Sequence, residues 1–323
     1  MQAIEISEFG PAEVMKYVER PTPEPGPDQV RVRHSAIGLN FIDTYHRSGL
    51  YAVELPFTPG TEAAGVIDAL GEGVSSAKVG DRVVYNSRSL GAYAEANIVD
   101  AEAIIPLPDG VPERLAASLT LKGMTAHYLL KSSFTVSAGD WVLVHAAAGA
   151  TGSILVQWLV HLGAMVIGTV GSAEKAEAAA KLGAHHVINY QEADFAEEVR
   201  RITDGRGVDV VYDGVGKSTA RGSMASLKRR GMFVSFGNAS GAVEPIAPLE
   251  LMKAGSIYLT RPTLADFTRT REERLRRAGE LFDLISSRVI GAEVANVYPL
   301  SDAGQAHKDL EARKIRGLSV LIP

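Results

Sequence analysis

The sequence predicts an α/β protein of two domains: a doubly wound domain with a six-stranded parallel sheet, and a second domain that is mostly β. Two observations lead to this prediction, the length of the chain and a change in its pattern near residue 123. The 323 residues, 46% hydrophobic and 22% charged, suit about two globular domains. Before residue 123 the apolar runs are short and interrupted by proline and glycine, whereas after it strand-like runs alternate with helical segments.

The mostly β domain is expected to draw on two separate parts of the chain. In residues 1–122, short β-branched runs stand between turn residues such as those of "PTPEPGP" at 21–27. After Pro262 a charged helical segment leads to "VANVYPL" and "LSVLIP", β-like pieces without a strand–helix alternation. We therefore expect residues 1–122 and 263–323 to form one domain and residues 123–262 to form the doubly wound one.

The doubly wound domain is predicted from six apolar runs, each separated from the next by a helical segment. Parallel strands need such crossovers, which are right-handed. Six strands joined in this way fit a doubly wound sheet. The predicted strands are "WVLVHA", "MVIGTV", "HVINY", "VDVVY", "MFVSFG" and "SIYLT", and the predicted helices are "TGSILVQWLVHLGA", "AEKAEAAAKLGA", "FAEEVRRIT", "STARGSMASLK" and "PLELMKA".

A loop rich in glycine and alanine, "HAAAGATG" at 145–152, joins the first of these strands to the first helix. Small residues let a backbone approach a pyrophosphate, and the helix amino end presents free N–H groups to it. The frame Ala146-x-x-Gly149-x-x-Gly152 is displaced from the usual G-x-G-x-x-G, so by itself it also fits a plain tight turn. Its position at the start of a six-strand alternation favours a dinucleotide site.

The end of the second strand favours NADP over NAD. A site for NAD needs an acidic residue there to accept hydrogen bonds from the ribose 2′-hydroxyl, and "TVGSAEK" at 169–175 begins without one. Ser172 can instead cap the next helix, whose free N–H groups suit a phosphate. Lys175, in the first turn of that helix, can neutralise a 2′-phosphate, although a solvated lysine is the alternative interpretation.

Several kinds of chemistry lack support in the sequence. The chain has no cysteine, which excludes disulfides, thiolate zinc sites and a cysteine nucleophile. None of its eight histidines stands in an H-E-x-x-H motif, so we expect no metal. "GNASG" at 237–241 fails the nucleophile-elbow pattern because Ser240 is its fourth residue. Asp213, where a buried strand leaves the sheet, either caps a loop or lines the cofactor crevice, and we favour the cap.

Charge and hydropathy also restrict the partners. The net charge of −5 and the mixing of Glu272 and Glu273 among the arginines of 269–277 argue against nucleic-acid binding. The amino-terminal residues do not resemble a signal peptide, and no apolar stretch of 18 residues occurs. We therefore expect a cytoplasmic protein that does not enter the membrane.

Four motifs resemble the NADPH:quinone oxidoreductases, the zeta-crystallin-like branch of the zinc-free medium-chain dehydrogenase/reductase superfamily. They are "GLNFIDTYHRSGLY" at 38–51, "PGTEAAGVI" at 59–67, "AAAGATG" at 146–152 and "VSFGNASG" at 234–241. The resemblance implies a GroES-like catalytic domain packed on a Rossmann domain, an active cleft between them, and a homodimer joined through Rossmann sheet edges. Zinc-bearing relatives carry "GHE" where this chain has Gly60-Thr61-Glu62, so threonine replaces the histidine ligand.

The resemblance also implies which residues hold NADPH. Gly214 is a departure, because relatives often carry serine there, although its backbone still suits the nicotinamide side. The implied contacts to NADPH include Asn40, Phe41, Ile42, Asp43, Thr44, Tyr45, Tyr128, Gly149, Ala150, Thr151 and Gly152. Those to the 2′-phosphate are Gly171, Ser172, Lys175, Tyr190 and Arg313, and those to the ribose and nicotinamide side are Phe236, Gly237, Asn238 and Ala239, closed by Thr260, Arg261 and Pro262.

Quinone reduction needs donors that stabilise the charge developing on the quinone oxygen. Tyr45, Asn40 and Arg261 are the catalytic candidates, with Tyr51 as a further one, and each could instead be structural. The sequence leaves hydride transfer and one-electron transfer equally open. Two alternatives remain: a reductase of α,β-unsaturated carbonyls that uses the same NADPH site, and a non-catalytic NADPH-binding protein.

Overall fold

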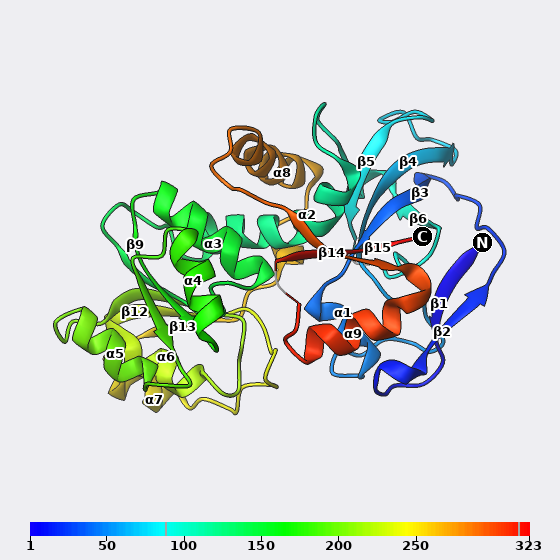
Figure 1. Cartoon of the computed structure of the whole chain (residues 1–323). Helices are drawn as coiled ribbons and strands as arrows, with labels where there is room; N and C mark the ends of the chain where they lie inside the picture. Colours follow the sequence, from blue (N-terminus) through cyan, green and yellow to red (C-terminus); the bar gives the residue numbers. More distant parts are fainter. Residues whose placement is uncertain (88, 316) are drawn as a thin grey trace. The chain divides into compact units, whose positions relative to one another are not determined.

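The computed structural model describes residues 1–87, 89–315 and 317–323 and divides them into two units (Figure 1). Residues 263–267 and 287–291, which the sequence placed with the first domain, belong to the second unit. The Phe267 ring stacks on Tyr128 with centroids 4.5 Å apart, and the Gly291 N–H donates to Gln157 at 2.8 Å, which explains the difference. Unit 1 comprises Met1–Lys122, Thr268–Ser286 and Ala292–Pro323; unit 2 comprises Gly123–Phe267 and Ser287–Gly291.

Unit 2 contains the expected six-stranded parallel sheet, with strand order β10-β9-β8-β11-β12-β13. The chain adds strands on one side of β8 up to β10 and then on its other side from β11 onward, while all strands stay parallel. This is the arrangement of a doubly wound sheet, so the predicted Rossmann architecture is confirmed. The strands are β8 (Trp141–Val144), β9 (Met165–Val170), β10 (His186–Asn189), β11 (Val208–Asp213), β12 (Leu227–Ser235) and β13 (Tyr258–Thr260). The helices are α3 (Ala150–His161), α4 (Ala173–Lys181), α5 (Phe195–Ile202), α6 (Ala220–Ser226) and α7 (Pro248–Lys253).

Unit 1 is mostly β, as expected, and its main sheet runs in the order β14-β15-β3-β4-β5-β7, with β6 also paired to β3. The carboxyl-terminal strand β15 pairs antiparallel with β3, which returns the tail to this unit. The strands are β3 (Gln29–Gly38), β4 (Glu62–Leu70), β5 (Arg82–Asn86), β6 (Ala96–Asp100), β7 (Ile104–Pro106), β14 (Val294–Pro299) and β15 (Leu318–Ile322), beside the hairpin of β1 (Gln2–Ile6) and β2 (Met15–Glu19). The helices are α1 (Phe41–Arg47), α8 (Arg271–Ser286) and α9 (Ala303–Glu311); α2 (Glu113–Tyr128) continues into unit 2 and a π-helical turn, Leu129–Ser133.

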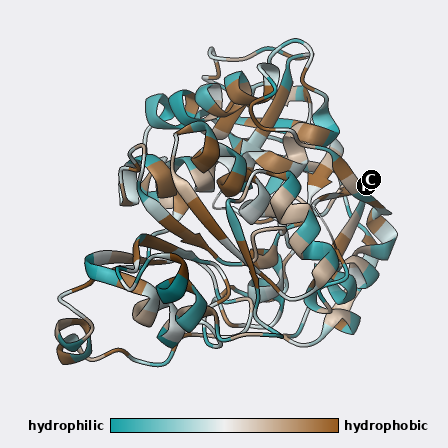
Figure 2. Cartoon of the chain, turned by 60° about the vertical axis from the view of Figure 1, so that its left-hand side comes forward, coloured by the Kyte–Doolittle hydropathy of each residue, from teal (hydrophilic) through white to brown (hydrophobic). Residues whose placement is uncertain are grey.

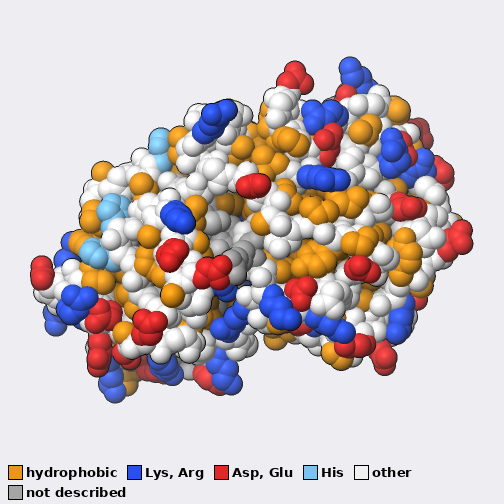
Figure 3. All heavy atoms as spheres, viewed as in Figure 1, with side chains coloured by type: hydrophobic (Ala, Val, Ile, Leu, Met, Phe, Trp, Pro, Cys, Tyr) orange, Lys and Arg blue, Asp and Glu red, His pale blue; other side chains and the backbone are white. Residues whose placement is uncertain are grey.

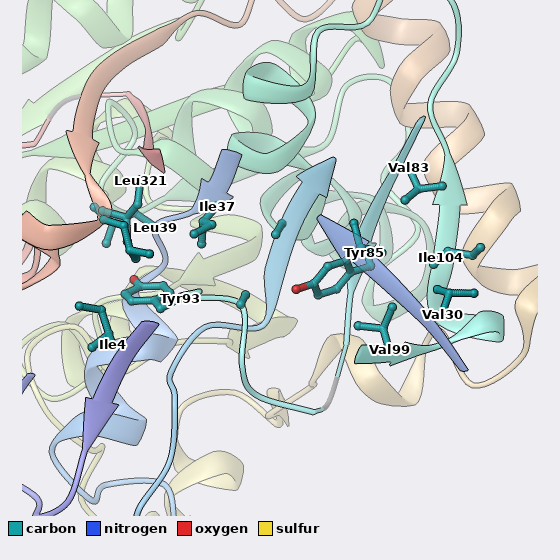
Figure 4. Packing of buried hydrophobic residues seen from close by; sticks show 14 of the residues in the cluster. Ile4, Val30, Ile37, Leu39, Val83, Tyr85, Tyr93, Val99, Ile104 and Leu321 are labelled. Carbon is teal, nitrogen blue, oxygen red and sulfur yellow. The ribbon is translucent and has the colours of Figure 1, made fainter. Parts of the chain in front are cut away.

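The two sheets differ in how their strands are buried. In β3, Val30 and Val32 are buried while their neighbours are partly exposed, which is the alternation of a sheet with one face in the core. In β11 every residue is buried, as expected for a parallel strand covered on both faces. Figure 2 shows the strands largely in the hydrophobic colours. In the core of unit 1, Tyr93 packs near Ile4 and Leu321, as Figure 4 shows.

The surface is mixed in character. On the face drawn in Figure 3, acidic and basic side chains are interspersed with apolar ones. No helix in the part of the chain that the structure describes is both long enough and apolar enough to cross a membrane.

Candidate active site

The glycine-rich loop of unit 2 has the geometry that close backbone approach requires. Strand β8 ends at Val144, and Gly149 precedes the first turn of α3. A Cβ on Gly152 would lie 2.2 Å from the Ala146 carbonyl oxygen, so only glycine fits there. The first N–H groups of α3 have no acceptor within the helix, and such a helix end suits an anion. The pyrophosphate site predicted at Gly149, Ala150, Thr151 and Gly152 therefore coincides with a helix amino end.

The end of β9 and the start of α4 form the region predicted to hold a 2′-phosphate. The Ser172 hydroxyl accepts a hydrogen bond from the Lys175 N–H at 3.3 Å, which confirms the predicted helix cap. A Cβ on Gly171 would lie 2.4 Å from the Tyr190 hydroxyl, so the glycine makes room for that tyrosine. The structure thus brings Gly171, Ser172, Lys175 and Tyr190 to one corner of the sheet. Arg313 belongs to unit 1, where it follows α9.

Asp213, at the end of β11, is a loop cap, as predicted. One carboxylate oxygen accepts hydrogen bonds from the N–H groups of Val215 and Gly216 at 2.8 and 2.9 Å and from the Thr219 hydroxyl at 2.9 Å. The other oxygen accepts from the Ser223 hydroxyl at 2.8 Å. Because both oxygens are taken up by the protein, this carboxylate organises the loop and is not free to bind a cofactor.

Glycine at position 214 has a physical reason. A Cβ on Gly214 would lie 2.9 Å from the tip of the Phe236 ring, and one on Gly237 would lie 2.4 Å from the Gly214 carbonyl oxygen. The loops after β11 and β12 therefore touch through their backbones, and Ala239 donates its N–H to Gly214 at 3.3 Å. A serine at 214 would meet the Phe236 ring.

The remaining candidates of unit 2 lie at its sheet edge or against its helices. Thr260 ends β13, Arg261 follows it with an exposed side chain, and the Arg261 guanidinium donates to the Pro262 carbonyl at 3.0 Å. Tyr128 is buried under Phe267. At the carboxyl ends of the parallel strands the structure gathers Gly149–Gly152, Gly171–Lys175, Tyr190, Gly214, Phe236–Ala239 and Thr260–Pro262.

In unit 1, the aromatic candidates lie in α1 or just after it. The rings of Tyr45 and Tyr51 meet edge to face at 5.2 Å, and Phe41 lies 6.0 Å from Tyr45. The Thr44 hydroxyl donates to the Phe41 carbonyl at 2.7 Å, so its side chain is engaged by its own helix. The structure thus brings the two tyrosine candidates together at this helix.

Asn40, which precedes α1, has its side chain fixed by a buried ion pair. The Lys122 ammonium donates to the amide oxygen at 2.6 Å, and the amide nitrogen donates to Glu62 at 2.9 Å. The Leu121 N–H donates to the other oxygen of Glu62. Burial raises the pKa of the Glu62 carboxyl, and the nearby Lys122 ammonium opposes that rise. Burial lowers the pKa of Lys122, opposed by Glu62.

A second buried chain of hydrogen bonds anchors α1 through Asp43. Arg47 can only donate, so its 3.0 Å contact makes His307 Nδ1 an acceptor and leaves the proton on Nε2. His307 Nε2 then donates to the Tyr93 hydroxyl at 3.0 Å, and that hydroxyl donates to Asp43 at 3.0 Å. Asp43 also accepts from the Asn40 N–H at 2.9 Å. Burial raises the pKa of Asp43 to about 7 and, with the Arg47 charge, lowers the pKa of His307 to about 3.

These two networks contain residues that the sequence did not indicate. Glu62 stood within a quoted motif, but it had no role beyond its place in the zinc comparison. Lys122 is a lysine amid small and apolar residues of "SLTLKGMTA", which was a signal available in the sequence. Tyr93 and His307 are 214 positions apart in the chain, so no local pattern could pair them.

Comparison with known proteins agrees with this geometry. The alcohol dehydrogenase GroES-like domain model matches residues 26–109, and the zinc-binding dehydrogenase model matches residues 150–284. The chain is 47% identical to quinone oxidoreductase 1 of Escherichia coli over 99% of both chains, and 45% identical to a quinone oxidoreductase of Pseudomonas aeruginosa, also over 99% of both. It belongs to the quinone oxidoreductase family of the medium-chain dehydrogenases/reductases. It is therefore an oxidoreductase.

Solved structures of family members share the whole fold. The E. coli quinone oxidoreductase complexed with NADPH superposes with a TM-score of 0.98 at 46% identity, and all of both chains is covered. A mycobacterial protein complexed with NADPH gives 0.97 at 51% identity, again with full coverage. A 2-haloacrylate reductase of Burkholderia is 47% identical over 93% of this chain and 92% of its own.

The match to a zinc-binding dehydrogenase family raises the question of a metal. Within residues 1–87, 89–315 and 317–323, no group of three or more His, Cys, Asp or Glu side chains could hold one. The resemblance places Thr61 where zinc-bearing relatives would carry histidine. Its hydroxyl is buried without a partner among the described residues. The neighbouring Glu62 carboxylate is compensated by Lys122, with 3.9 Å between the charged atoms. A lysine ammonium thus supplies positive charge beside this acid.

Proposed function

We propose that this protein reduces quinones with NADPH. The observation that carries the proposal is the full-length similarity of this chain to quinone oxidoreductases. Two of the solved structures that it resembles are complexes with NADPH. The end of β9 supports NADPH in particular. Thr169, Val170 and Gly171 place no carboxylate at the strand end, where an NAD site needs one, and Ser172, Lys175 and Tyr190 lie beside it.

The residues present fit such a cofactor. The first turn of α3 offers N–H groups to a pyrophosphate, and Gly149 and Gly152 carry no side chain that could block its approach. Lys175 would neutralise the 2′-phosphate, and the loops at Gly214 and Phe236 would border the nicotinamide. When bound, NADPH supplies the reducing electrons that a quinone accepts.

The catalytic candidates remain part of this proposal. Asn40, Tyr45 and Tyr51 in unit 1 and Arg261 in unit 2 carry N–H or O–H groups that suit a quinone oxygen gaining negative charge. Positioning of the acceptor would provide most of the rate, and hydrogen bonds from these groups would stabilise the charge that develops. The Arg313 contact stays a prediction.

The test is a panel of initial rates for cofactor oxidation. NADPH and NADH are each combined with 1,4-benzoquinone, 9,10-phenanthrenequinone and a simple enone. We expect turnover with the quinones and a preference for NADPH. Cofactor binding without turnover of any acceptor would instead indicate a non-catalytic NADPH-binding protein.

Reduction of α,β-unsaturated carbonyls is a second candidate function. It is favoured by the 47% identity to a 2-haloacrylate reductase, whose name describes reduction of a conjugated carbon–carbon double bond. It would use the same NADPH site. Turnover of the enone alone, in the same panel, would favour this candidate over quinone reduction.

A homodimer joined through β13 is also part of the proposal. This strand is at the edge of the six-stranded sheet, and Tyr258 and Leu259 in it are 57% and 38% exposed. An unpaired apolar edge is suited to pairing with a second copy. Light scattering would give twice the chain mass, and Leu259→Lys should shift it towards one chain mass. The cytoplasmic location expected from the amino-terminal sequence stays a prediction, which fractionation of cells would test.

A further inference from the structure

We propose that Lys122 and Glu62 are positioning residues that hold the Asn40 side-chain amide in one orientation and so aim its second N–H at the substrate oxygen. The inference rests on the placement of Lys122, which can only donate, at one side of the Asn40 amide and of Glu62, which accepts, at the other. The inference rests on the proposed function, because it gives a role to one catalytic candidate of that reaction.

The two contacts determine which way the amide faces. An ammonium has only hydrogens to offer, so Lys122 requires the amide oxygen, which it meets at 2.6 Å. An ionised carboxylate only accepts, so Glu62 requires the amide nitrogen, which it meets at 2.9 Å. Rotating the amide by half a turn would place N–H against ammonium and oxygen against carboxylate. Both favourable contacts would become repulsive, so the reversed orientation is disfavoured.

The arrangement leaves one donor for a ligand. The amide nitrogen of Asn40 carries two hydrogens, and in the described part of the chain Glu62 takes one of them. The other hydrogen keeps a fixed direction because the amide plane is held at both ends. Preorganised donors of this kind act in catalysis without a reorganisation cost during the reaction.

The clamp is itself held firmly. The Leu121 N–H donates to the Glu62 oxygen that faces away from Asn40, and Lys122 is the next residue of the same helix. A Cβ on Gly38 would lie 2.4 Å from the Glu62 carboxylate, so the end of β3 has a glycine where the carboxylate packs. Segments at 38–40, 62 and 121–122 therefore converge on one amide.

A purely structural role explains the buried charges less well. Glu62 is fully buried and Lys122 is 5% exposed. Replacing such a pair by apolar side chains is often neutral or stabilising, so the pair needs another reason for its presence. At the start of α1, Asn40 and Asp43 form a capping box, in which Asp43 accepts the Asn40 backbone N–H at 2.9 Å without either member of the pair. The pair acts on the side chain of Asn40.

A double-mutant cycle tests the inference. Asn40→Ala should lower kcat with 1,4-benzoquinone by about 10- to 100-fold, the range for loss of one preorganised donor. Lys122→Met should lower kcat by about tenfold in the protein with Asn40 and have less than about a twofold effect in the Asn40→Ala background. Lys122→Met should change the KM for NADPH by less than about twofold in either background. Lys122→Arg, which keeps a pure donor, should recover part of the loss.

The controls separate folding from positioning. Lys16→Met, at an exposed lysine, should leave kcat unchanged. If Lys122→Met does not give the circular-dichroism spectrum of the unmutated protein, Glu62→Gln completes the same cycle, with the same expected dependence on Asn40. A Lys122 or Glu62 effect that persists in full in the Asn40→Ala background would overturn the inference.

Other outcomes assign the failure. Full activity of Asn40→Ala would overturn the inference and the role of Asn40, while quinone reduction would stand. No quinone turnover by the unmutated protein would overturn the proposed function and, with it, the inference.

Discussion

The nucleotide-binding edge of unit 2 and the start of α1 in unit 1 are built in opposite ways. The first relies on backbone groups and glycines that lie close together in the sequence, such as Gly149 and Gly152. The second relies on buried charged side chains from distant segments, such as Asp43 and His307, linked through Tyr93. A backbone-built site depends on the absence of side chains, whereas a side-chain-built site depends on partners. The two should therefore fail in different ways when mutated.

The largest expected effect is that of Gly152→Ala. The added Cβ would lie 2.2 Å from the Ala146 carbonyl oxygen, and the loop backbone would have to move. We expect NADPH affinity to fall by more than about 100-fold, as befits loss of a close backbone approach. Titration calorimetry measures it. Gly279→Ala in α8 is the matched control, because a Cβ there meets no atom within 4 Å, and it should bind NADPH normally.

Lys175→Ala sharpens the assignment of the 2′-phosphate corner. Loss of a charge-assisted hydrogen bond of about 1.5–3 kcal/mol corresponds to a rise of about 10- to 100-fold in the KM for NADPH. The KM for NADH should hardly change, since NADH has no 2′-phosphate. Lys181→Ala, at the far end of α4, serves as the control. Equal effects of Lys175→Ala on the two cofactors would contradict the assignment.

Tyr93→Phe tests the side-chain-built region. The substitution removes the hydroxyl that accepts a hydrogen bond from His307 and donates a hydrogen bond to Asp43, both at 3.0 Å. Buried groups left without partners should lower the free energy of unfolding by about 1–3 kcal/mol, measured in urea. Tyr17→Phe, at a residue 47% exposed, should change it by less than about 0.5 kcal/mol. If the two variants have the same free energy of unfolding, the hydrogen bonds of the Tyr93 hydroxyl contribute nothing to stability.

The smallest expected effect is a pH dependence that comes from Asp43. Burial raises the pKa of Asp43 to about 7, from an ordinary value of 3.8. Between these values the folded state keeps a proton that the unfolded chain has lost, so stability falls as pH rises. The Asp43→Asn variant lacks this titrating carboxyl. Between about pH 5 and 7, its free energy of unfolding should therefore fall by up to about 2 kcal/mol less than that of the unmutated protein. Urea unfolding of both proteins at the two pH values measures this difference. If the free energy of unfolding changes with pH by the same amount in both, the raised pKa of Asp43 is contradicted.

Comparing the two regions also explains what could be read from the sequence. The six-strand alternation, the Ser172 cap and the Asp213 cap follow from local patterns, and the structure confirms them. The division at Lys122 and Gly123 lies where the pattern changes, whereas residues 263–267 follow unit 2 because Phe267 stacks on Tyr128.

The side-chain networks could not be read in the same way. Lys122 and Asn40 are separated by 82 positions, and Arg47 and His307 by 260. Their pairing depends on how β3, β4, α2 and α9 come together, which no local periodicity encodes. The lysine within "SLTLKGMTA" was an exception to an apolar pattern, and such exceptions are where a sequence can point to a buried site.

NADPH-dependent quinone reduction is tested in one experiment by the ratio of kcat/KM for NADPH to that for NADH, with 1,4-benzoquinone as acceptor. We expect quinone turnover and a ratio of at least about 10, since binding of a 2′-phosphate should contribute about 1.4 kcal/mol or more. A ratio near one, or no quinone turnover with either cofactor, would contradict it.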